Sequence, residues 1–182
     1  MKKSVYEDAR RRALELYEKA HIVLTQEEKD HLEVADLGLG RLEETGLQIV
    51  TYVNTERCCA KEMSLFPGQT CPEHRHAPIP ELNYPGKEET FRCRYGVCYV
   101  YVDGEPTENP VCQPPKGDEA YYTAKHQVIL HPGDQFTMEP NTRHWFQAGP
   151  EGAIVSEFST KSLDEYDIFT DPHIKRVPTL EE

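Results

Sequence analysis

Three histidines and one glutamate in this sequence have the residue types and spacing of a metal site. His74 and His76 are two residues apart, so on a strand both imidazoles point to the same side. Glu89 could add a carboxylate oxygen from a neighbouring strand, and His144 a third imidazole from the start of another strand. Three neutral nitrogens and one oxygen suit a divalent metal such as manganese, iron, nickel, zinc or cobalt. We therefore expect these four residues to bind a metal ion.

A lysine and a glutamate occur on strand faces that otherwise point into the protein. Lys61 alternates with Met63 and Leu65, and Glu157 alternates with Val155. Burial raises the pKa of a carboxylate and lowers the pKa of a lysine, and both shifts favour acid–base chemistry. We predict that Glu157 transfers a proton and that Lys61 polarises or protonates a substrate oxygen. Two alternatives are that they form a structural ion pair, or that both face solvent.

The elements that must position these residues are two helices followed by strands. Residues 4–20 carry apolar side chains at steps of three and four, which is typical of an amphipathic helix. Thr25 and Glu28 form a capping box, which predicts a second helix from Gln26 to about Val34. Later segments are short, rich in β-branched and aromatic residues, and separated by Gly, Pro, Asn and Asp. They predict strands at 47–53, 58–66, 90–95, 97–102, 126–130, 135–138, 144–147 and 153–159.

About eight short strands predict a β sandwich or barrel, and a chain of 182 residues is the usual size of one domain. We expect one domain comprising a helical segment (1–45), a barrel (46–160) and a tail that packs on the barrel (161–182). The net charge of −12 disfavours nucleic acid and anionic lipid as partners. The six cysteines contain no C-x-x-C pair, so we expect free thiols. The first residues lack the apolar segment of a signal peptide, so we expect a cytoplasmic protein.

The order of the candidate ligands resembles the two motifs of the cupin superfamily. The matching residues are Gly68, His74 and His76, then Glu89 and Gly96, then Pro132-Gly133-Asp134 and His144. The resemblance implies a mainly β fold, the cupin double-stranded β-helix or jelly-roll barrel, here with N-terminal helices and the metal inside. The chain departs from the motif because twelve residues separate His76 from Glu89, which leaves Glu88 as an alternative ligand. We prefer Glu89 because it keeps the motif's six residues before Gly96.

Longer phrases resemble the bacterial D-lyxose ketol-isomerases. They are Tyr52–Thr55, Leu65–His76, Glu89–Gly96, Pro140–Gly149 and Asp167–Pro172. The resemblance implies an enzyme, usually manganese-dependent, that interconverts D-lyxose and D-xylulose and often accepts D-mannose and D-fructose. Cupins are often homodimers, which we expect here too. We expect Asp167 and Phe169 to contact the sugar, with the tail across the barrel mouth. His126, on the face of Val128, either binds a sugar hydroxyl or is a core histidine.

Aldose–ketose isomerisation moves a hydrogen between C1 and C2 of the sugar. A metal bound to the carbonyl and the adjacent hydroxyl would act as a Lewis acid. Either a proton transfer through a cis-enediol or a metal-assisted hydride shift fits the same ligands. Two other functions remain as alternatives: a cupin dioxygenase, and a cupin that binds a sugar without converting it.

Overall fold

Nine strands and two helices make up most of the computed structural model, which describes residues 1–177. The helices are α1 (Lys3–Lys19) and α2 (Gln26–Asp30), and the short 3-10 helices are η1 (Pro80–Leu82), η2 (Glu119–Tyr121) and η3 (Asp164–Tyr166). The strands are β1 (Glu33–Ala35), β2 (Leu47–Asn54), β3 (Cys59–Leu65), β4 (Thr70–Arg75), β5 (Glu89–Val102), β6 (His126–Leu130), β7 (Gln135–Met138), β8 (His144–Ser159) and β9 (Ile168–Phe169).

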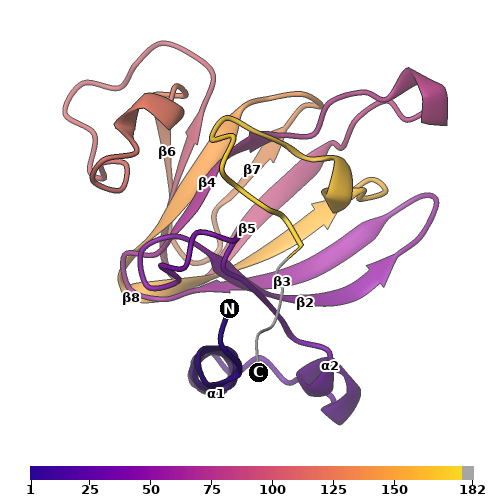
Figure 1. The fold of residues 1–182 in the computed structure, drawn as a ribbon, viewed down its shortest axis with the longest axis vertical. Helices are drawn as coiled ribbons and strands as arrows, with labels where there is room; N and C mark the ends of the chain where they lie inside the picture. The colour runs from indigo at the N-terminus through magenta and orange to yellow at the C-terminus, as the bar shows by residue number, and fades with distance from the viewer. Residues whose placement is uncertain (178–182) are drawn as a thin grey trace.

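The two long strands β5 and β8 organise the barrel. They pair antiparallel from Glu89 opposite Ser159 to Val102 opposite His144. The first half of β5 also pairs with β7 and its second half with β6. The first half of β8 also pairs with β4, and its second half with β3. Each long strand therefore runs through both walls of a curled antiparallel sheet (Figure 1). This confirms the predicted mainly β, cupin-type barrel with N-terminal helices.

A glycine allows β5 to bend where the sequence predicts two separate strands. Gly96 has φ of 67°, a conformation that other residues adopt at a cost. A Cβ at this position would lie 2.0 Å from the carbonyl oxygen of Gly152 on β8. The sheet pairing shifts on both sides of Gly96, and the strand continues beyond it. The expected strands 90–95 and 97–102 are thus one bent strand, as are 144–147 and 153–159.

The helices cover the outer face of β2 and β3 (Figure 1). The apolar stripe of α1 buries Ala9, Ala13 and Tyr17, and the Tyr17 hydroxyl donates to the Glu62 carbonyl oxygen at 2.8 Å. The capping box at Thr25 is confirmed, but α2 ends at Asp30 and does not reach Val34. Val34 instead lies in β1, where it is buried and pairs with β2, so sheet pairing overrides the helical pattern. Within residues 1–177, neither helix is long and apolar enough to cross a membrane.

The barrel interior is apolar along much of its length and polar at the end where the tail crosses it. Its buried core includes Leu65, Phe91, Val100, Phe146 and Val155. All six cysteines are free, as predicted. After β8 the chain returns across the barrel, where β9 pairs with β4. Of the expected tail, residues 178–182 lie outside the described residues.

Candidate metal centre

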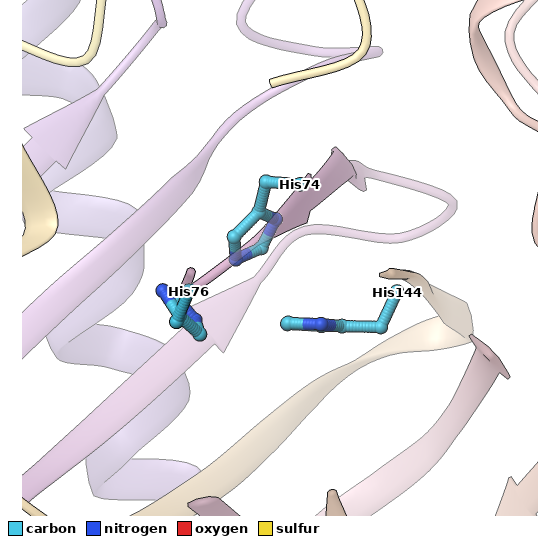
Figure 2. Close-up of side chains that lie close together, drawn as sticks. All are labelled: His74, His76 and His144. Atoms are coloured by element: carbon cyan, nitrogen blue, oxygen red, sulfur yellow. The ribbon is translucent and has the colours of Figure 1, made fainter. Parts of the chain in front are cut away.

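Three histidine side chains converge inside the barrel. His74 lies on β4 and pairs in register with His144 at the start of β8, while His76 directly follows β4. One ring nitrogen of each histidine lies within 4.8 Å of the others. Figure 2 shows the three rings directed toward one another, and all three residues are buried. The register of β4 against β8, together with the spacing of His74 and His76, thus brings the predicted imidazoles together.

The hydrogen bonds of the three rings fix which nitrogen faces the site. The Nδ1 atoms of His74 and His144 donate to backbone carbonyl oxygens, at 2.8 and 3.0 Å. His76 Nδ1 donates to Asp167 Oδ1 at 2.5 Å. Because these partners accept only, Nδ1 carries a proton in each ring, and Nε2 is the atom that faces the site and can ligate a metal. A histidine held in this way is prepared to ligate a metal through Nε2.

Glu89 completes the donor set from β5. Its Oε1 atom lies 3.1 Å from the Nε2 atoms of both His76 and His144. None of these three buried atoms makes a hydrogen bond. Buried polar atoms without partners are costly, and a divalent cation among these three, in place of any proton on the rings, would satisfy them all. Glu88 is exposed, so of the two glutamates only Glu89 reaches the histidines.

The electrostatics of the site favour positive charge at this position. Burial lowers the pKa of His76, but Glu89 and Asp167 outweigh burial and raise it to about 9. His74 behaves differently, because burial and the neighbouring histidines hold its pKa well below the ordinary value. Four carboxylates line the surrounding cavity with two lysines and one arginine, which leaves one negative charge for a proton on His76 or a bound metal ion to offset. A nitrogen-rich donor set with one carboxylate in such a field fits a divalent transition metal.

Lys61 and Glu157 face each other from paired positions on β3 and β8. Both are buried, and Lys61 Nζ lies 4.0 Å from Glu157 Oε1. Lys61 Nζ also lies 2.7 Å from Asp164 Oδ2 and donates to Ser162 Oγ at 3.0 Å. The structure thus places both predicted side chains inside the barrel, next to the candidate metal ligands. The alternative that they face solvent is wrong, and Lys61 does take part in ion pairs.

Lys87 is a second buried lysine that the sequence analysis missed. Its Nζ lies 2.9 Å from Glu89 Oε2 and donates to Glu157 Oε1 at 3.0 Å, so it connects a candidate metal ligand to the candidate base. Glu157 Oε1 also accepts from Ser159 Oγ at 2.8 Å. Lys87 occurs in a proline-rich loop without strand alternation, so no local pattern marks it. The only feature of the sequence that could have indicated its role is its position two residues before the candidate ligand Glu89.

Both lysines remain charged, contrary to the expectation for Lys61. Burial lowers the pKa of Lys61, but the charges on Glu157 and Asp164 outweigh burial and leave it raised. Burial likewise opposes the charge on Lys87, yet Glu157 and Glu89 raise its pKa well above the ordinary value. The prediction of a lowered lysine pKa is therefore wrong, because it considered desolvation without the neighbouring carboxylates.

A cavity of about 40 Å³ lies among these groups. Asp167 and Phe169 both line it, as does Phe146, and the ring of Phe169 lies 5.3 Å from that of His74. His126 does not line the cavity. It is exposed at the start of β6, and its Nδ1 lies 3.0 Å from the Glu105 carbonyl oxygen. The expected core position for His126 is therefore wrong. His126 shares the sheet face of Val128 but lies at the exposed end of β6, and its contact with the sugar stays a prediction.

Comparisons with known proteins identify the family of the chain. The family model described as D-lyxose isomerase matches residues 17–182. The chain is 63% identical over 182 residues to a D-lyxose/D-mannose isomerase of Thermosediminibacter oceani, covering 100% of this chain and 99% of the relative. It is 55% identical over 181 residues to a D-lyxose ketol-isomerase of Cohnella laeviribosi, covering 100% and 98%.

Solved structures of L-ribose isomerases have a similar fold. A point mutant of the Acinetobacter sp. DL28 enzyme in complex with L-ribose superimposes with a TM-score of 0.82 at 17% identity, covering 100% of this chain and 98% of that chain. The L-ribose-bound enzyme of Cellulomonas parahominis gives a TM-score of 0.76 at 19% identity, covering 96% and 94%. At these low sequence identities, the solved structures show only that the fold is similar. The family model and the relatives above 50% identity, which cover almost the whole chain, show the family. The chain belongs to the D-lyxose isomerase family.

Proposed function

We propose that this isomerase interconverts D-lyxose and D-xylulose, and D-mannose and D-fructose, with a divalent metal held by His74, His76, Glu89 and His144. The substrates are inferred from the names of the relatives, of which one is a D-lyxose/D-mannose isomerase. The observation that carries the metal is the set of buried acceptors at Glu89, His76 and His144. We propose manganese as the native metal, because a mixed set of imidazoles and one carboxylate accommodates it.

The metal, when bound, supplies Lewis-acid polarisation of adjacent sugar oxygens. Glu157 is the proposed base, which takes the proton from one of the two reacting carbons and returns it to the other. Its carboxylate lies on the wall beside the candidate metal ligands, where Lys87 and Ser159 hold Oε1. A carboxylate fixed in this way can serve both half-reactions without reorienting.

Lys61 and Lys87 supply positive charge beside the reacting carbons. Their ammonium groups can donate hydrogen bonds to sugar oxygens and stabilise the negative charge that develops there. The phenylalanines 91, 146 and 169 line the same cavity and keep water away from the reacting carbons. This arrangement supports isomerisation by proton transfer rather than chemistry that needs a second substrate.

The experiment follows D-lyxose and D-mannose during incubation with Mn²⁺-loaded protein, with ketose formation measured by chromatography. We expect D-xylulose from D-lyxose and D-fructose from D-mannose, without oxygen consumption. Solvent deuterium appearing at C1 or C2 would support the proton transfer by Glu157, whereas complete retention would favour a hydride shift. If the folded, metal-loaded protein forms no ketose but consumes oxygen, the isomerase proposal is wrong and a cupin dioxygenase is favoured instead. The homodimer and the cytoplasmic location stay predictions, and sedimentation analysis tests the first.

A further inference from the structure

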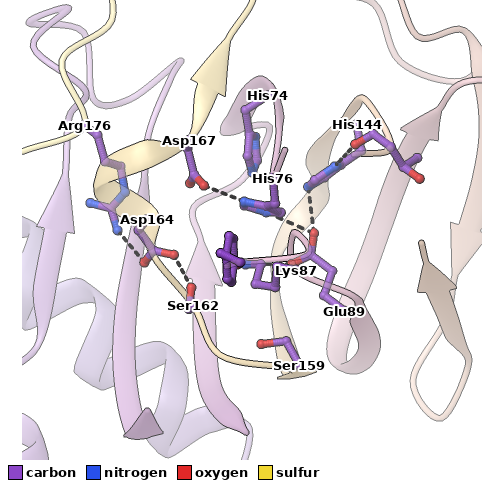
Figure 3. A network of polar contacts seen from close by, with 12 residues as sticks. His74, His76, Lys87, Glu89, His144, Ser159, Ser162, Asp164, Asp167 and Arg176 are labelled. Carbon is purple, nitrogen blue, oxygen red and sulfur yellow. Dashed lines mark hydrogen bonds and ion pairs between the residues drawn. The ribbon is translucent and has the colours of Figure 1, made fainter. Parts of the chain in front are cut away.

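His76 differs from the other two histidines in what holds its ring. The Nδ1 atoms of His74 and His144 donate to carbonyl oxygens only two residues earlier in the chain. His76 Nδ1 donates to the carboxylate of Asp167, which is 91 residues away in the sequence. Figure 3 shows His76 between Asp167 on one side and Glu89 on the other. The orientation of this ring therefore depends on where a distant segment lies.

Asp167 belongs to residues 163–176, which we call the tail segment. This segment docks on the strand that carries the candidate ligands, because β9 pairs with β4 and places Phe169 opposite His74. Thr170 Oγ1 donates to the carboxylate of the buried Glu73 at 2.6 Å, and Thr170 N donates to the Glu73 carbonyl oxygen at 3.0 Å. The docked tail segment thus holds Asp167 against His76.

One oxygen of the Asp167 carboxylate, Oδ1, is engaged in this contact. The Asp167 side chain is 8% exposed, and Oδ1 accepts the His76 Nδ1 proton, a hydrogen bond to a charged acceptor. A sugar hydroxyl would have to compete with this bond for the same oxygen. The geometry therefore favours a role through His76 over the direct sugar contact expected from the sequence.

We propose that Asp167 is a positioning residue that fixes the tautomer and orientation of His76, and thereby couples docking of the tail segment to metal binding. The inference rests on the metal site of the proposed function. Loss of a carboxylate or carbonyl partner behind a metal-ligating histidine typically lowers metal affinity about 10–100-fold. Because such coupling is reciprocal, bound metal stabilises the docked tail segment by the same factor.

The first test is titration of the chelator-stripped protein with Mn²⁺ by calorimetry. Asp167→Ala is expected to weaken Mn²⁺ binding about 10–100-fold, and Asp167→Asn by less, because the amide keeps an acceptor but loses the charge. Glu165→Ala is the matched control, since Glu165 is an exposed residue of the same segment and its loss changes the net charge equally. This control is expected to bind Mn²⁺ like the parent. If Asp167→Ala does not fold, Asp167→Asn decides the question.

The second test is hydrogen exchange of the tail segment with and without Mn²⁺. The metal is expected to slow exchange in residues 163–176 in the parent and in Glu165→Ala, and to have a much smaller effect in Asp167→Ala. Unchanged Mn²⁺ affinity in both Asp167 variants, with a raised KM for D-lyxose, would overturn the positioning role in favour of a sugar contact. A parent protein that binds no Mn²⁺ would overturn the metal centre itself, and this inference with it.

Discussion

Replacing Lys87 by methionine is expected to destabilise the protein by about 3–5 kcal/mol, the usual cost of removing one partner from a buried ion pair. The Lys87 ammonium lies 2.9 Å from Glu89 Oε2 and 3.0 Å from Glu157 Oε1, and the three side chains are 1–3% exposed. Without this cation, two buried carboxylates are left without the positive charge that they share. Methionine fills a similar volume, so the loss of charge dominates the effect.

This loss of unfolding free energy corresponds to a large decrease in Tm. For a domain of this size, each 1 kcal/mol lowers Tm by about 2–4 °C, so Lys87→Met is expected to lower it by about 6–20 °C. Calorimetry should be done on chelator-treated protein, because a metal bound at Glu89 would compensate for part of the missing charge. Mn²⁺ should therefore reduce the difference from the parent.

A double-mutant cycle separates the ion pair from packing. Glu157→Gln removes the second charge, so Lys87→Met/Glu157→Gln is expected to be more stable than the sum of the two single changes predicts, by at least about 1 kcal/mol. Additive effects, or a Tm of Lys87→Met within about 2 °C of the parent, would refute this reasoning.

Three further changes test separate parts of the structure. Glu157→Gln is expected to lower kcat by about 10²–10⁴-fold while Mn²⁺ affinity changes little, because an amide cannot accept the proton; parallel losses in both would argue against a base. Gly96→Ala is expected to lower Tm more than Gly68→Ala. Both glycines have φ near +70°, but only at Gly96 would a Cβ meet a carbonyl oxygen at 2.0 Å, so equal shifts would count against the close approach. Burial raises the pKa of Asp164, but Lys61 and other cations outweigh it and hold the pKa below the ordinary 3.8. Its contribution to stability is therefore present above about pH 4 and is lost as the pH falls below that value. The Tm difference between the parent and Asp164→Asn should stay constant above about pH 5 and shrink below pH 4, and a difference that grows in acid would contradict the ion pair.

Local signals predicted a β sandwich or barrel and the pairing of His74 with His76, and the resemblance to the cupin motifs implied the barrel and the full set of ligands. Alternating apolar residues and turn residues mark the strands, and the spacing of His74 and His76 orients two imidazoles to one side. The expected strand list omitted β4, because a proline and charged residues occupy most of its positions. It also split β5 at Gly96, since a glycine inside a strand pattern looks like a turn.

Other features depend on contacts that no local pattern encodes. Lys87 reaches Glu157 from a loop 70 residues earlier in the chain, and Asp167 reaches His76 across 91 residues. The charge of Lys61 depends on Asp164, which is 103 residues away. His126 follows the alternation of its strand, but alternation predicts only which face of the sheet a side chain lies on. It does not predict how far along the strand the cavity extends.

The most direct test of the central claim is isomerisation of D-lyxose by chelator-stripped protein as Mn²⁺ is returned, with bound metal and D-xylulose measured in the same samples. We predict that activity rises in proportion to bound metal and saturates at one Mn²⁺ per chain. His144→Ala should remain folded, bind Mn²⁺ far more weakly and form no D-xylulose at the same metal concentration. Full activity in the stripped protein, or a His144→Ala variant as active as the parent, would contradict a metal-dependent isomerase centred on these residues.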